Sequence, residues 1–128
     1  MAKLPEEVKA AIDKAAYVCV ATTDDEAVAN VVYVSYLKYQ DEETIIIADN
    51  KFSKTRQNLS INPKLSFVVL DTDTKKSYQV KGAVTSYSEG EQYQSVVDWV
   101  HVKHPQTTPF SALYIEVEEV FCGSEKIA

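Results

Sequence analysis

The sequence predicts an antiparallel β-barrel of about six strands with helices covering it. Three observations support this class. Short apolar stretches rich in β-branched residues recur along the chain, polar turns of a few residues separate most of them, and three segments with helical spacing interrupt them. Strands joined by such short turns pair antiparallel, because a parallel connection needs a dozen or more residues. With 128 residues, 45% of them hydrophobic, the chain suits one domain with a substantial core.

The first half of the chain is predicted to hold two helices and three strands. Residues 4–15 have the apolar spacing of a helix, with Pro5 in its first turn. Residues 53–61 form a second, shorter helix, which Asn62-Pro63 ends. Three apolar stretches separated by acidic turns are predicted as strands: residues 17–22, 27–39 and 44–48.

The second half is predicted to hold three strands and one helix. Ser88 and Glu91 have the spacing of a capping box, and the residues after them repeat apolar side chains at helical intervals until His104-Pro105. The strands are expected at residues 64–70, 77–87 and 113–121. The alternation of the last strand changes phase at Glu118-Glu119, which indicates a β-bulge.

The overall charge and the first residues exclude several classes of function. The formal net charge is −6, which argues against nucleic-acid binding, because that needs a basic face with many phosphate contacts. No apolar run approaches the roughly 18 residues of a membrane helix, and the first residues lack the pattern of a signal peptide. We therefore expect a cytoplasmic protein without nucleic-acid or membrane partners, with Cys19 and Cys122 reduced.

A cluster of basic residues stands out against this acidic total. Lys51, Lys54 and Arg56 lie within six residues, and no acid lies among them. Ser53 is a suitable N-cap, so the amides that follow it would point outward at the positive end of the helix dipole. Cations in a first helical turn oppose that dipole unless an anion binds there. The cluster favours a phosphate monoester site, and the alternative is a solvated helix start whose cations balance nearby acids.

The residues around this cluster resemble a known family in four segments: residues 34–41, 44–50 and 53–58, and Asn62-Pro63. They are similar to the FMN-binding split-barrel family related to pyridoxamine 5′-phosphate oxidase, in particular to its short single-domain FMN-binding proteins. The resemblance implies that residues 1–128 are one six-stranded antiparallel split barrel, mainly β with helical covers. It also implies a homodimer with two FMN molecules at the subunit interface. A small barrel filled by its own side chains likewise leaves a large cofactor to bind in an outer groove.

The resemblance also assigns residues to the cofactor. Lys54 and Thr55 resemble the pair that holds the FMN phosphate, with Ser53 beside them, whereas Arg56 has no firm counterpart. Three residues resemble the strand that runs along the flavin and ribityl chain: Val32, Tyr33 and Val34. Three more resemble the loop that meets the isoalloxazine ring through main-chain groups: Ala48, Asp49 and Asn50.

From these features we expect an FMN-dependent oxidoreductase with a small-molecule or protein electron donor and acceptor. Residues 114–128 contain no Arg-rich motif like the one that pyridoxamine-phosphate oxidases use on their substrate, so a different substrate is expected. The alternatives are an FMN carrier or electron-transfer module, a split barrel that binds a deazaflavin or haem, and a dimeric scaffold whose site has decayed.

Two further sets of side chains are candidate site residues. Tyr33 and Tyr36 could flank a ring, with core or interface packing as the alternative. His101 and His104 are three apart on the predicted helix and could pair on a metal. No third ligand is evident in the sequence, so no metal is expected.

Overall fold

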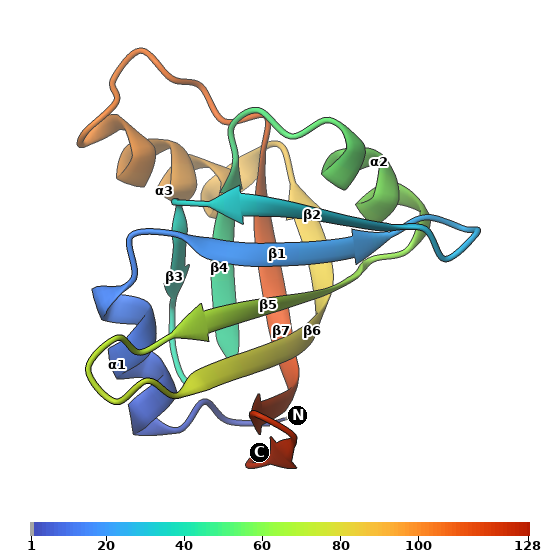
Figure 1. Ribbon diagram of the computed structural model, residues 1–128. Coiled ribbons are helices and arrows are strands. Elements are labelled where there is room, and N and C mark those ends of the chain that lie inside the picture. Colours follow the sequence, from blue (N-terminus) through green and yellow to red (C-terminus); the bar gives the residue numbers. More distant parts are fainter. Residues whose placement is uncertain (1) are drawn as a thin grey trace.

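The computed structural model describes residues 2–128 and shows one strongly curled antiparallel sheet with three helices on its outside (Figure 1). The strand order in the sheet is β2-β1-β5-β6-β7-β4-β3, and β8 pairs with β7. The helices are α1 (Glu6–Lys14), α2 (Lys54–Ile61) and α3 (Gly90–His101). The strands are β1 (Val18–Thr23), β2 (Ala29–Val34), β3 (Leu37–Tyr39), β4 (Thr44–Asp49), β5 (Lys64–Leu70), β6 (Ser77–Tyr87), β7 (Ser111–Cys122) and β8 (Glu125–Lys126).

The predicted number of six strands was wrong, because the described residues form eight. The predicted strand at residues 27–39 is two strands, separated at Ser35 and Tyr36. The first, β2, pairs with β1, and the second, β3, pairs with β4, so the two lie at opposite edges of the sheet. The chain must leave one edge and join the other within two residues, which interrupts the ladder. The short β8 adds the eighth strand beside the end of β7.

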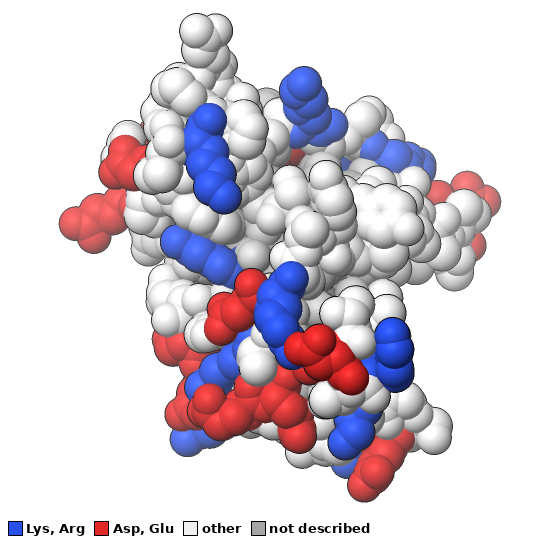
Figure 2. Space-filling view, turned by 60° about the vertical axis from the view of Figure 1, so that its left-hand side comes forward, with Lys and Arg blue, Asp and Glu red and all other residues white. Residues whose placement is uncertain are grey.

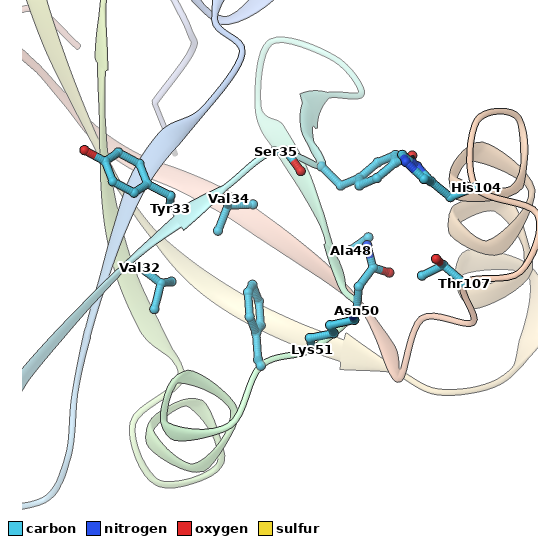
Figure 3. A pocket seen from close by; sticks show the side chains of 11 residues that line it. Val32, Tyr33, Val34, Ser35, Ala48, Asn50, Lys51, His104 and Thr107 are labelled. Atoms are coloured by element: carbon cyan, nitrogen blue, oxygen red, sulfur yellow. Dashed lines mark hydrogen bonds between the residues drawn. The ribbon is translucent and has the colours of Figure 1, made fainter.

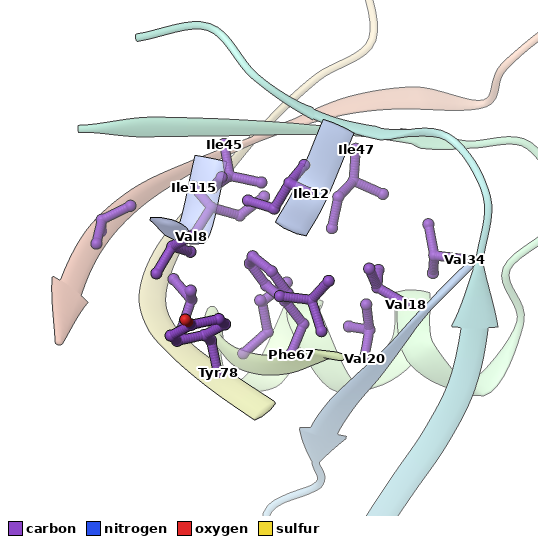
Figure 4. Close-up of a cluster of buried hydrophobic side chains, with 14 of the residues drawn as sticks. Val8, Ile12, Val18, Val20, Val34, Ile45, Ile47, Phe67, Tyr78 and Ile115 are labelled. Carbon is purple, nitrogen blue, oxygen red and sulfur yellow. The ribbon is translucent and has the colours of Figure 1, made fainter. Parts of the chain in front are cut away.

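The interior of the curled sheet is filled with apolar side chains, as predicted for a barrel of this size (Figure 4). Its largest fully buried members include Phe67 of β5, Ile45 and Ile47 of β4, and Ile115 of β7. Helix α1 packs beside β3 and β5 and adds the buried Val8 to this core. The interior therefore has no room for a large ligand, and any cofactor must bind on the outside.

The β6–β7 ladder contains the predicted bulge. Lys81 pairs with Glu119 and Gly82 pairs with Val117, so Glu118 is the extra residue. Glycine is required opposite the bulge, since a Cβ atom on Gly82 would lie 2.4 Å from Cγ2 of Ile115 and 2.5 Å from the backbone oxygen of Glu116. The bulge thus bends β7 at the point where β6 approaches it closely.

Helix α3 covers the outer face of β4 and β7, where Val96 and Val100 pack against Ile46 and Ala112. The predicted capping box at its start was wrong. The helix begins at Gly90, and its cap residue Glu89 makes no side-chain capping hydrogen bond. Gly90 has a φ of +87°, a left-handed conformation that turns the chain and delays the helix beyond Ser88. None of the helices within residues 2–128 is long and apolar enough to cross a membrane.

Candidate functional site

An open groove lies where the two edges of the sheet meet. Its walls come from the end of β2, the Ser35-Tyr36 link, the end of β4 with the loop that follows, and the segment after α3. Its volume is about 490 Å³. Figure 3 shows the side chains of these four segments around one space. The groove exists because the β2–β3 break leads the chain across the gap in the split barrel.

One wall of the groove is apolar. Val32 and Val34 of β2 line the groove from the face of the strand that packs against the core, where Val34 is buried, and the Tyr33 side chain between them points to the other face (Figure 3). This alternation is that of any strand, in which successive side chains face opposite sides of the sheet. Phe52, from the loop after β4, also lines the groove. All three β2 residues that the resemblance assigns to the cofactor therefore line the groove, although the Tyr33 ring faces outward.

The end of β4 brings a small residue and an amide to the groove. Ala48 and Asn50 both line it, and Lys51 of the basic cluster lies beside them (Figure 3). The Oδ1 atom of Asn50 is buried and has no hydrogen-bond partner among residues 2–128. A buried acceptor without a partner is energetically unfavourable. A ligand that presents an N–H or O–H donor would satisfy this oxygen if the side chain turned it toward the groove.

Asp49 has a different position from its two neighbours. Its side chain is 1% exposed and does not line the groove. The Arg56 side chain donates two hydrogen bonds to it, from Nε at 2.7 Å and from Nη2 at 3.0 Å, and the Phe52 amide donates a third at 3.0 Å. The hydrogen bond to Asp49 raises the pKa of Arg56, and the Arg56 guanidinium also stacks on Phe110 at 3.7 Å from the ring centre. The Arg56 side chain therefore holds the loop after β4 through these contacts.

The start of α2 carries the predicted phosphate residues. Ser53 occupies the N-cap position, but its hydroxyl makes no capping hydrogen bond, and the first turn contains no acid. The Nζ atom of Lys54 lies 3.9 Å from a carboxylate oxygen of Asp24 in the β1–β2 turn. Thr55 is 2% exposed, and its hydroxyl accepts a hydrogen bond from Asn30. These three residues sit beside the groove but do not line it, whereas Lys51 does.

Asp24 competes with any anion for Lys54. The backbone amides of Val28 and Glu26 donate to its carboxylate, and together with Lys54 they lower the pKa of Asp24. The basic cluster of the sequence is thus divided in three. Arg56 pairs with Asp49, Lys54 lies near Asp24, and Lys51 forms no ion pair with the described residues.

The far wall of the groove was not predicted from the sequence. His104 and Thr107, which follow α3, line the groove opposite β2. The Tyr36 hydroxyl and Nδ1 of His104 are 2.5 Å apart, and the Tyr36 ring meets the indole of Trp99 edge to face at 5.1 Å. The sequence marked His104 only as a possible metal partner of His101, since only the folded sheet brings it to Tyr36.

The two histidines of α3 and its end do not form the metal pair considered above. Nε2 of His101 lies 2.9 Å from the carbonyl oxygen of Thr107, and His104 bonds to Tyr36. Within residues 2–128, no three His, Cys, Asp or Glu side chains are grouped so that they could hold a metal ion.

Comparison with known proteins gives a consistent set of relatives. Residues 4–122 match the family described as pyridoxamine 5′-phosphate oxidase. The uncharacterized protein MJ0282 of Methanocaldococcus jannaschii is 30% identical over 121 residues, which are 93% of this chain and 80% of that protein. Among solved structures, HupZ of Group A Streptococcus has a TM-score of 0.86 at 25% identity, with 98% of both chains covered. An FMN-binding protein from Syntrophomonas wolfei has a TM-score of 0.82 at 22% identity, covering 93% of this chain and 85% of that one.

Proteins named for haem and for F420 share this fold. The haem storage protein HutZ from Vibrio cholerae has a TM-score of 0.70 at 17% identity, covering 94% of this chain and 95% of that one. An F420 reductase has a TM-score of 0.72 at 14% identity, covering 92% of this chain and 98% of that one. At these identities the likeness concerns the fold alone. The family match spans almost the whole sheet and all three helices, and the chain therefore belongs to the pyridoxamine 5′-phosphate oxidase family.

Proposed function

We propose that this chain binds FMN, with the flavin ring in the groove and the phosphate at the start of α2, and that it acts as an FMN-dependent oxidoreductase. The observation that carries the proposal is the junction of two unlike surfaces. An apolar wall formed by Val32, Val34 and Phe52 leads directly to Lys51 and the uncapped start of α2. FMN has the matching shape, a flat ring system joined by a polar chain to a phosphate.

The groove fits this cofactor in size and in its free polar groups. Its volume of about 490 Å³ lies within the range of roughly 300–1,000 Å³ that is typical of small-molecule sites. The unpartnered Oδ1 atom of Asn50 is an acceptor, and the isoalloxazine ring carries an N–H donor. A bound FMN would supply one- and two-electron redox chemistry, and the protein would supply its orientation and its electrostatic surroundings.

The start of α2 suits a phosphate group. Backbone amides at a helix N-terminus and the dipole behind them favour an anion, and Ser53 leaves those amides without a side-chain cap. Lys54 and Lys51 add two ammonium groups, and the Lys54 side chain is about half exposed, so it is free to move from Asp24 to a ligand. The Thr55 hydroxyl accepts a hydrogen bond from Asn30, so its own hydrogen is not used in that bond.

A second copy of the chain is the proposed cover of the groove. Strands β2 and β5 expose large apolar side chains, Val31 (63% exposed), Tyr33 (77%) and Val68 (41%), and Tyr17 just before β1 adds another (66%). Such a patch marks an interaction surface, and it begins at the strand that forms the apolar wall of the groove. We therefore expect Tyr33→Glu to shift the protein from dimer to monomer in sedimentation velocity and to weaken FMN binding. A variant that stays dimeric would rule out this face.

The proposal is tested by titration of the purified protein with FMN and with riboflavin, which lacks the phosphate. Quenching of flavin fluorescence gives both dissociation constants. We expect Lys54→Ala to weaken FMN by about 1.5–3 kcal/mol, roughly 10- to 100-fold, if Lys54 makes a charge-assisted phosphate bond, and to leave riboflavin unchanged. Lys76→Ala, in the exposed β5–β6 turn, is the matched control. A protein that takes up no FMN would refute the proposal.

Enzyme and carrier are distinguished by turnover. Oxidation of NADH or NADPH by the FMN-loaded protein in the presence of an electron acceptor is expected for the oxidoreductase, and stable FMN binding without turnover for a carrier. A haem site is the second candidate, because His104 presents an imidazole at the edge of the groove. Haem titration of wild type and His104→Ala would test it, since loss of the haem absorbance band in the variant alone favours that candidate.

A further inference from the structure

A second hollow opens on the other side of Tyr36 and is not used by the proposed FMN site. It has a volume of about 560 Å³ and is formed mainly by Ala15, Ala16, Tyr36, Trp99, Val102 and Lys103. We call it the Trp99 hollow. It lies between the α1–β1 link and the end of α3, and it shares Tyr36, Ser35 and His104 with the groove. The Tyr36 side chain is thus a wall common to both spaces.

The Trp99 hollow offers flat, apolar surfaces. The Tyr36 and Trp99 rings meet at 85° with their centres 5.1 Å apart, and the His104 ring meets Tyr36 at 77°. Ala15 and Ala16 also line the hollow, and their small methyl side chains leave room for a planar ring. Aromatic walls around a narrow space favour a flat aromatic ligand, because ring faces and edges pack well against each other.

The charges at the Trp99 hollow are positive. Lys103 lines it, and the Nζ atom of Lys38 lies 4.3 Å from the centre of the Trp99 ring. No acid lines the hollow within the described part of the chain. Two acids of the adjoining helices are held by neutral donors, since Asp98 accepts a hydrogen bond from Gln94 and Asp13 accepts one from Tyr39.

The wider surface is mixed in charge. Figure 2 shows that Asp and Glu side chains gather over the lower half of this face, whereas the upper half carries separate Lys and Arg side chains with a few acids at its left and right margins. The centre of the upper half therefore carries less negative charge than the lower half, although the formal net charge of the chain is −6.

We propose that the Trp99 hollow is a binding site for a planar aromatic carboxylate, with the ring between Trp99, Tyr36 and the two alanines and the carboxylate toward Lys103. Only the Tyr36 side chain would separate this ligand from a ligand in the groove. Binding there does not require FMN, so this proposal and the proposed function can fail independently.

The chain contains a built-in reporter for this site. Trp99 is its single tryptophan, so tryptophan fluorescence comes from the hollow alone. The probe is 4-nitrobenzoate, a flat carboxylate that quenches indole fluorescence, and its neutral counterpart is 4-nitrobenzyl alcohol. Free N-acetyltryptophanamide corrects for absorption by the probes. We expect saturable quenching by the carboxylate, with weaker binding of the alcohol.

Two variants separate charge from shape. Lys103→Gln is expected to weaken the carboxylate about five-fold, the magnitude of an exposed ion pair of about 1 kcal/mol, and to leave the alcohol unchanged. Lys76→Gln is the control lysine. Ala16→Phe places a ring in the hollow at an exposed position and is expected to abolish binding of both probes while circular dichroism shows the wild-type fold.

Several results would overturn the proposal. These are linear quenching without saturation, equal affinity for the carboxylate and the alcohol, and probe binding that Ala16→Phe leaves intact. A second copy of the chain is the other possible occupant. If Ala16→Phe changes the oligomeric mass in sedimentation velocity, the hollow is a subunit contact and not a ligand site. A parallel FMN titration of each variant shows separately whether the groove is affected.

Discussion

Arg56 holds a buried carboxylate, and its replacement by alanine is expected to destabilise the fold by about 2–4 kcal/mol. Asp49 is 1% exposed and would lose two hydrogen bonds, at 2.7 and 3.0 Å, together with the positive charge that balances it. Breaking a fully buried pair from one side costs about 3–5 kcal/mol. The Arg56 side chain is 37% exposed, which lowers that figure, and the loss of its stacking on Phe110 adds about 0.5–1 kcal/mol.

Urea denaturation followed by circular dichroism measures the effect. With a slope of about 2 kcal/mol per molar urea, the midpoint should fall by roughly 1–2 M. The matched control is Lys64→Ala, because Lys64 pairs with Glu118 at 2.8 Å where both side chains are substantially exposed, and such pairs contribute at most about 1 kcal/mol.

A second substitution tests the physical reason for the loss. Asp49→Asn in the Arg56→Ala background removes the unbalanced charge, so the double variant should be more stable than Arg56→Ala alone. If Arg56→Ala costs no more than Lys64→Ala, the interpretation of this pair as a buried structural contact is wrong.

Two other predictions concern the sheet and its acid stability. Gly82→Ala is expected to destabilise the fold by about 1–3 kcal/mol or more, since its Cβ would meet the Glu116 backbone at 2.5 Å; a chemical denaturation curve like that of wild type would contradict the tight β6–β7 approach. The pKa of Asp71 is lowered in the folded protein, mainly by hydrogen bonds from Lys14. The stability that the ionised Asp71 contributes is therefore present above the unfolded pKa of about 3.9 and is lost as pH falls through the folded pKa. The difference in Tm between wild type and Asp71→Asn should therefore be constant from pH 5 to pH 8 and shrink below about pH 4; a difference that persists at pH 2 would refute the assignment.

The sequence predicted the regular parts of the fold well because their signals are local. Strands β5 and β6 have the predicted bounds, since alternation of buried and exposed residues needs only the strand itself and one core. The bulge at Glu118 was predicted for the same reason. The break at Ser35-Tyr36 was not, because the residues on both sides are equally good strand formers and the interruption comes from the closure of the whole sheet.

For the candidate site, too, residues with a local sequence signal were found and residues placed by tertiary packing were not. Four residues that the resemblance assigns to the cofactor line the groove: Val32, Val34, Ala48 and Asn50. They belong to segments with recognisable motifs, and their binding of FMN stays a prediction. The wall that carries His104 was missed, since it follows α3 and reaches the groove only through tertiary packing. Whether Ser53, Lys54 and Thr55 hold a phosphate stays a prediction.

The two-residue link between β2 and β3 also has a consequence for how the protein folds. Strands that are neighbours in sequence lie at opposite edges of the sheet, so β2 and β3 are in their final places only when all the pairings from β1 to β4 are formed. The groove, which is lined by segments from both edges, is therefore complete only in the closed sheet. A ligand in the groove would bind only the complete fold and stabilise it by mass action, so ligand uptake during refolding would follow the final closure of the barrel and not its initial collapse.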